Sequence, residues 1–167
     1  MRSLICLALV MGMTALCSAQ TPAQIAAKLT AADAIVDFQE AQGDAANAHT
    51  DANDQRDYAI NDVRPECIDE DYLLEGDNHI TSGDIDRAVG ATTYNQAGPF
   101  GTAAVDAYND GITHWNAGEY ADAADDFSTS ISNSSSAYAR YTTAEAKFIA
   151  ARDEYCAAEV SFWNGWE

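Results

Sequence analysis

The stretch AYARYTTAEAKFIAARDEYCAAEVSF, residues 137–162, decides the fold. Apolar or aromatic side chains recur in it at alternating intervals of four and three residues, and small residues alternate with large ones. The eight positions are Ala137, Tyr141, Ala144, Phe148, Ala151, Tyr155, Ala158 and Phe162. This period is that of a packed helical seam. We therefore expect the last helix of the chain to place its aromatic stripe in a protein core rather than around a ligand.

Helices are also expected in the rest of the chain, because Ala is abundant while there are only 10 Gly and 3 Pro. The first helix is predicted to begin at Thr21-Pro22 and to end at Pro65, either continuous or broken near Gly43. One of its rows is built mainly from small residues, which allow another helix to approach closely. That row contains Phe38, Ala41, Ala45, Ala48, Ala52, Gln55 and Ala59.

Three more helices are predicted between the first and the last. We expect one from Ser82 to about Ala97, ended by Gly98-Pro99, one from about Thr102 to Trp115, and one from Glu119 to about Ile131. Residues 66–82 and 132–136 have the composition of loops. The sequence therefore predicts an all-α, up-and-down bundle of about five helices, formed by residues 20–167 as a single domain.

The N-terminus has the layout of a secretory signal peptide. Arg2 precedes an uncharged apolar run from Leu4 to Leu16, and the small residues Cys17-Ser18-Ala19 follow it. The run is shorter than the about 20 apolar residues that span a bilayer. We predict cleavage after Ala19 and a secreted, periplasmic or cell-surface protein with no integral membrane span in its mature form. An uncleaved anchor is the alternative.

Cys67 and Cys156 are the two cysteines outside the predicted signal peptide, residues 1–19. In an oxidising compartment such a pair is read as one disulfide. It would close a loop of about 90 residues and stabilise the fold by about 4–5 kcal/mol in the chain-entropy model. In a five-helix bundle both residues fall at the same pole, which agrees with this pairing. Two free thiols or a metal-binding pair are the alternatives.

The chain is strongly acidic, with 27 Asp and Glu against 8 Lys and Arg and a formal charge of −19. Loss of Arg2 with the signal peptide makes the charge −20. Such a charge repels the phosphates of nucleic acids and of anionic lipids. It therefore excludes nucleic acid as a partner and favours a soluble monomer or at most a weak oligomer.

An acidic segment, residues 66–86, contains the one polar cluster with a metal-binding composition. We take Asp69, Glu70, Asp71 and Asp77 as its candidate ligands, because Ca²⁺ binds six to eight oxygen atoms. The spacing does not match the helix-loop-helix calcium loop, and a solvated acidic loop is the alternative. No other cofactor is expected.

No catalytic motif is present. The histidines His49, His79 and His114 do not stand at metal-motif spacing, and neither a phosphate-binding loop nor a nucleophile elbow occurs. We therefore predict that the protein is not an enzyme. Asn133-Ser134-Ser135 matches the acceptor for N-glycosylation, in the predicted loop.

Residues 104–137 resemble one helical hairpin of the tetratricopeptide type. The matching positions are Gly111, Trp115, Gly118, Tyr120, Ala123 and Phe127. The resemblance implies two helices that cross closely at Gly and Ala, with aromatic rings packed beside the crossing. Members of the family use stacked copies to bind proteins. A shift by the 34-residue period finds no second copy here, so we expect one hairpin within the bundle.

These observations rank three functions. The first is a secreted or envelope-associated, non-catalytic helical protein with a protein-binding or structural role, whose protein partner is unidentified. The second is a protein that binds a divalent cation or small ligand through the acidic segment, residues 66–86. The third is a hydrolase with an unrecognised site. The aromatic end of the chain, Phe162 to Trp166, is either part of the core or a docking element.

Overall fold

The computed structural model describes residues 20–166, and between them every regular element is a helix. Three long helices are present: α2 (Pro22–Tyr58), α3 (Glu70–Ala117) and α4 (Tyr120–Asn164). The end of α2 is extended by a π-helical turn, Ala59–Val63, and a 3-10 turn, Arg64–Glu66. The predicted all-α class is confirmed, while the predicted number of five helices is wrong. The predicted signal peptide, residues 1–19, lies outside the described residues.

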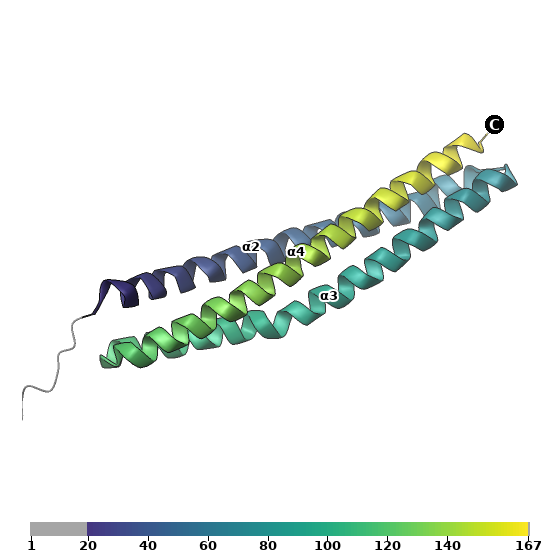
Figure 1. Cartoon of the computed structure of the whole chain (residues 1–167). Coiled ribbons are helices and arrows are strands. Elements are labelled where there is room, and N and C mark those ends of the chain that lie inside the picture. Colours follow the sequence, from purple (N-terminus) through teal and green to yellow (C-terminus); the bar gives the residue numbers. More distant parts are fainter. Residues whose placement is uncertain (1–19, 167) are drawn as a thin grey trace, which may run out of the picture.

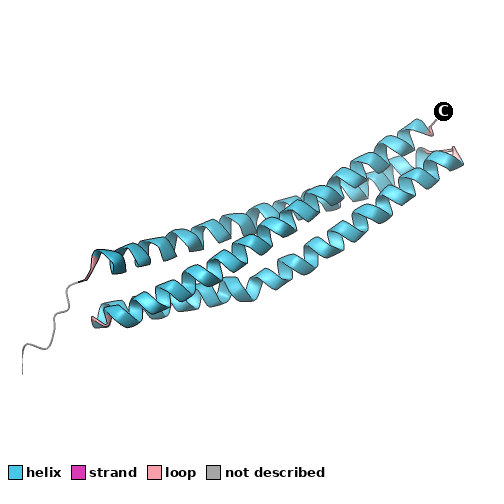
Figure 2. Cartoon of the chain, viewed as in Figure 1, coloured by secondary structure: helices cyan, strands magenta, loops and turns pink. Residues whose placement is uncertain are grey.

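The helices run up, down and up to form an elongated bundle, so that α2 and α4 are parallel and α3 is antiparallel to both (Figure 1). Helix α4 packs along α3 and along α2, whereas α2 and α3 touch each other much less. Loops are confined to the two ends of the bundle (Figure 2). No helix in the described part of the chain is both long and apolar enough to cross a membrane.

The predicted helix ends at Gly98-Pro99 and at residues 132–136 do not occur. Pro99 lies inside α3, although its missing N–H leaves the Asn95 carbonyl without its helical donor. Buried Ala97 and Gly101 flank it, and their packing holds the helix on both sides. In α4, the Ser135 hydroxyl donates to the Ile131 carbonyl, 2.9 Å away. Such bonds satisfy serine hydroxyls within a helix, so a serine-rich segment remains helical.

Three of the helix ends have recognisable caps, namely the start of α2 and both ends of α3. Thr21 and Gln24 form a capping box at the start of α2, at the predicted position. The helix then continues through Gly43 without a break. Asp69 caps α3, so most of the segment predicted to be a loop, residues 66–82, is helical. Gly118 ends α3 with φ +82°, a left-handed conformation that favours glycine. The chain therefore turns between Ala117 and Tyr120, at the break predicted between the helix that ends near Trp115 and the helix that begins at Glu119.

The interface between α3 and α4 is made of aromatic rings packed on positions without large side chains. On α3 these positions recur every seven residues and are buried: Gly76, Gly83, Gly90, Ala97, Ala104 and Gly111. The rings of Phe162, Tyr155, Phe148 and Phe127 on α4 lie against the four glycines. A Cβ atom at Gly90 would lie 2.7 Å from the Phe148 ring, and one at Gly111 would lie 2.7 Å from the Phe127 ring. The predicted C-terminal seam is therefore buried. At the four glycines, α3 lies so close to the rings of α4 that a side chain on α3 would collide with them.

Helix α2 contributes its row of small residues to the same core. Ala45, Ala52 and Ala59 are fully buried, as the sequence pattern predicts. Phe38 is the large member of this row, and it lies against Gly101 of α3. In the register of the rings on α4, Ser134 occupies the position between Phe127 and Tyr141. The Phe38 ring from α2 thus fills the core near the level of Ser134, the position in this series where α4 has no aromatic side chain.

The C-terminus closes one end of the bundle. Phe162 is fully buried with Val63 and Ala158, and the Gly165 carbonyl accepts hydrogen bonds from the backbone N–H groups of Ile68 (2.9 Å) and Asp69 (3.2 Å). These contacts support the core interpretation for Phe162, whereas Trp163 and Trp166 are 36% and 54% exposed and lie outside the core.

The predicted disulfide between Cys67 and Cys156 is absent, and both thiols are free. Cys67 lies beside Gly165, where an added Cβ would stand 2.6 Å from its Sγ atom. Cys156 precedes Gly165 by nine residues on α4. At a rise of 1.5 Å per residue, it lies about 13 Å from Gly165 along the helix axis. The two sulfur atoms share one end of the bundle but differ in level by more than a disulfide can bridge.

The ring-on-glycine contact predicts opposite effects for one substitution at two helical glycines. Gly83→Ala places a Cβ atom in the Tyr155 ring, so it should lower the free energy of unfolding by about 1–3 kcal/mol. Gly43→Ala meets no atom within 4 Å and should raise it by about 0.5–1 kcal/mol through helix propensity. Urea denaturation of the two variants checks this. Equal stabilisation by both would show that α3 and α4 are not in close contact.

Candidate functional site

The most connected polar side chain is Asp84, where the three helices meet. From α2, Arg56 donates through Nε to Asp84 Oδ1 (2.7 Å) and through Nη2 to Oδ2 (3.2 Å). From α4, the Tyr155 hydroxyl donates to Oδ1 (2.8 Å). The hydrogen bond from Arg56 is the main cause that holds the pKa of Asp84 below its usual value. Burial, followed by the bond to Asp84, raises the pKa of Tyr155 to about 12.

The chemistry of this centre is structural. At neutral pH the Tyr155 phenol stays protonated and the Asp84 carboxylate stays charged, so each is held in its hydrogen-bonding role. Neither group is activated as a nucleophile or as a proton donor, since those roles need a pKa near the working pH. We conclude that Arg56, Asp84 and Tyr155 join the three helices in one register.

Other ion pairs also connect different helices or their extensions. Arg64 bonds Asp77 through two contacts (2.7 and 2.8 Å), and Lys147 bonds Asp86 (2.8 Å). Two histidines join α3 to α4 in the same way: His79 lies 2.7 Å from Glu154, and His114 lies 2.7 Å from Asp126. Most basic side chains and two of the three histidines are thus already engaged with carboxylates.

The four predicted calcium ligands do not converge. Asp69 caps α3 and accepts from the N–H groups of Asp71 (2.9 Å) and Tyr72 (3.3 Å). Asp77 is bonded to Arg64, whose hydrogen bond lowers the pKa of the Asp77 carboxyl. Glu70 and Asp71 are exposed in the first helical turn. Within residues 20–166, no group of three or more potential ligands is arranged to hold a metal ion.

The six residues predicted to pack in the hairpin lie at the α3–α4 turn. Gly111 faces the Phe127 ring, Ala123 is fully buried, and the Trp115 ring centre lies 5.1 Å from that of Tyr120. The Lys28 ammonium stands 4.8 Å above the Trp115 ring and ties α2 to this end. The arms of the hairpin are 48 and 45 residues long. The similarity to the tetratricopeptide family stays a prediction.

Asn133, the predicted glycosylation site, lies inside α4 and is only partly exposed. The expectation of a loop at this position is wrong, because the serines around it are accommodated in the helix.

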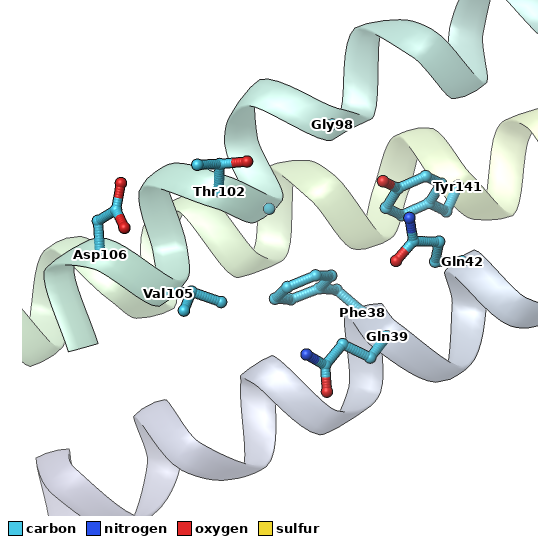
Figure 3. Close-up of a pocket in the computed structure, with 9 residues that line it drawn as sticks. Phe38, Gln39, Gln42, Gly98, Thr102, Val105, Asp106 and Tyr141 are labelled. Carbon is cyan, nitrogen blue, oxygen red and sulfur yellow. The ribbon is translucent and has the colours of Figure 1, made fainter. Parts of the chain in front are cut away.

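Two adjoining hollows open between α2 and α3, where these helices stand apart. They have volumes of about 370 and 390 Å³. Figure 3 shows the first, with the Phe38 ring between the two helices and Val105 and Thr102 on the wall from α3. Phe148 and Tyr94 line the second, and the His49 ring lies 4.5 Å from the Phe148 ring. Apart from Asp106 in the first hollow and His49 in the second, the residues that line the two hollows have aliphatic, hydroxyl, amide or aromatic side chains, or are glycines.

A different groove runs between the parallel helices α2 and α4. Three adjoining hollows form it, of about 170, 310 and 230 Å³, which share Asp37, Tyr138, Asp44 and Glu145 along their lengths. We define the acidic groove by its five carboxylates: Asp37, Glu40, Asp44, Asp51 and Glu145. Sequence reasoning missed it, because its residues come from two helices about 100 positions apart and have no local motif.

Comparisons of the chain with protein-family models, with curated proteins and with solved structures find no match.

The Asp84 centre predicts a stability that depends on pH. Because the folded pKa of Asp84 is below its usual 3.8, its contribution is present above that pH and is lost as the pH falls through the folded pKa. Asp84→Asn should lower the free energy of unfolding at pH 7 by about 1–2 kcal/mol, a range reduced because solvent screens these half-exposed groups. As the pH falls through the folded pKa of Asp84, the stabilities of the variant and the wild type should converge. Urea melts across pH check this, with exposed Asp110→Asn as control; a constant difference at all pH values would contradict it.

The pKa values of His114 and His49 are shifted in opposite directions from the usual value. The hydrogen bond that the His114 ring donates to the Asp126 carboxylate raises the pKa of His114 above 6.5, whereas burial, followed by the charge of Arg87, lowers the pKa of His49 below 6.5. The His114 contribution to stability is present below pH 6.5 and is lost as the pH rises through its folded pKa. That of neutral His49 is lost as the pH falls below 6.5. NMR titration of the ring protons measures both values. Asp126→Asn should return the His114 pKa toward 6.5, and an unchanged value would refute the pairing.

Proposed function

We propose that the protein is a secreted or envelope-associated, non-catalytic helical rod with a protein-binding or structural role. The observation that carries this proposal is the uninterrupted contact of α4 with α3, in which rings meet glycines at four levels from Gly76 to Gly111. Such packing gives a long bundle that resists bending and presents its outer helical faces to other molecules.

The arrangement of the ionisable groups supports the non-catalytic part of the proposal. His79, His114 and Asp84 are each held by a partner on another helix. The hollows of the described surface are open, and the hollow of about 390 Å³ is lined by one histidine and no carboxylate. A catalytic site usually places several converging polar groups in one cleft.

The test is fractionation of the host that produces the full-length chain with a C-terminal tag. We expect the full-length chain to be shortened and to appear in the envelope or the medium, and a variant made without residues 2–19 to remain in the cytosol. Chemical cross-linking of the exported chain should then capture the same few proteins in repeated preparations.

Gly83→Ala serves as the matched control for the cross-linking. This variant keeps the charge and the surface of the chain but loosens the α3–α4 contact. Capture should weaken with it if the rigid bundle is what partners recognise. An unprocessed cytosolic chain would refute export, and equal capture by a denatured chain would refute a role for the fold.

A further inference from the structure

We propose that the acidic groove between α2 and α4 binds a Lys- and Arg-rich amphipathic helix of a partner protein. This inference rests on the proposed protein-binding role and names the surface and the chemistry of the partner. It is carried by the charge of the groove, by an unpartnered polar atom at its end and by its repeating shape.

The charge of the acidic groove is not neutralised within the protein. In the part of the chain that the structure describes, none of its five carboxylates forms an ion pair, whereas Asp77, Asp84 and Asp86 elsewhere do. Arg152 is the one basic residue on its lining, and it bonds Asp153 rather than a groove carboxylate. Asp37, Glu40, Asp44 and Asp51 are exposed, and Glu145 is partly buried. A cationic partner therefore meets carboxylates that no internal cation occupies.

An independent observation at one end of the groove also indicates a ligand. Ser134 lines the hollow of about 170 Å³ together with Asp37 and Tyr138, and the residue is 1% exposed. Its hydroxyl has no hydrogen-bond partner among residues 20–166. By contrast, the hydroxyl of buried Ser130, one turn earlier, donates to the Ala104 carbonyl at 2.8 Å. A buried hydroxyl without a partner costs free energy, which a polar group entering the groove would recover.

The shape of the groove fits a helix. Ala34, Ala41 and Ala48 line it from α2 at intervals of seven residues, and Thr142 and Ile149 line it from α4 at the same interval. Small side chains with this period allow a further helix to pack along the groove between two parallel ones. From residue 34 to residue 51 the groove is about 26 Å long, which matches a helix of about 17 residues. Tyr138 and Ile149, 48% and 36% exposed, supply apolar contacts within it.

A second copy of this chain is a poor occupant. The chain carries a formal charge of −19, and among residues 20–166 only eight acidic side chains form ion pairs, out of 27 in the sequence, which leaves a surface dominated by carboxylates. Pairing of two copies through the acidic groove would bring like charges together. Charge complementarity therefore favours a foreign, basic helix.

The test uses the full-length mature protein and a synthetic peptide of about 18 residues, with Leu at helical spacing of three and four and Lys at the remaining positions. We expect the peptide to bind and to become helical, as followed by calorimetry and circular dichroism at low ionic strength. A peptide with Glu in place of Lys should not bind.

Two double variants with the same net charge locate the binding surface. Asp44→Asn with Glu145→Gln removes two groove charges, and should weaken binding about three- to tenfold, since an exposed ion pair contributes up to about 1 kcal/mol. Asp110→Asn with Asp125→Asn removes two exposed charges outside the groove and should change binding less than about twofold. Thermal melting confirms that both variants are folded.

The outcomes are distinct. No binding by wild type, equal loss in both double variants, or binding without gain of helix would each overturn the proposal. If the groove variant is still exported and still captures the same partners, the acidic groove is not the binding surface, while the proposed protein-binding role remains supported. Loss of capture with the groove variant alone would support both.

Discussion

The structure depends on the close contact between the rings of α4 and the glycines of α3. Each glycine lacks the atom that would collide with a ring, so the two backbones approach closely and the rings fill the space between them. A glycine in a helix costs about 1 kcal/mol relative to alanine. Burial of a Phe or Tyr side chain stabilises by about 1.5–3 kcal/mol, which offsets that cost. The contact also sets the register, because a shift of one residue would place rings against side chains.

The polar pairs follow from this register. With Gly83 seated against the Tyr155 ring, the neighbouring Asp84 is brought to the Tyr155 hydroxyl and to Arg56 of α2. The same alignment brings His79 to Glu154 and Lys147 to Asp86. Each pair is partly exposed and contributes little alone, but each favours one alignment over its alternatives. The chain therefore uses its few basic side chains to hold helices together.

The surfaces left open reflect the unequal packing of the three helices. Helix α4 contacts both other helices, whereas α2 and α3 contact each other little, and the two hollows with mainly uncharged linings lie between α2 and α3. On the other side, α2 and α4 run parallel and gather carboxylates from both into the acidic groove. The hollows between α2 and α3 thus have a single carboxylate, Asp106, in their linings, whereas the groove between α2 and α4 has five. A basic helix would be attracted to the second and not to the first.

The sequence by itself determined the helical class, the buried seam at residues 137–162, the small-residue row of α2 and the turn between α3 and α4, because each is a local pattern of period or of turn chemistry. Only the tertiary structure decided the number of helices. Pro99 and the serines at 132–136 are weak breaks that packing on both sides overrides, and the repeat of glycines in α3 has meaning only opposite the rings of α4. The separation of Cys67 from Cys156 and the assembly of the acidic groove likewise depend on how helices distant in sequence lie side by side, which no local pattern encodes.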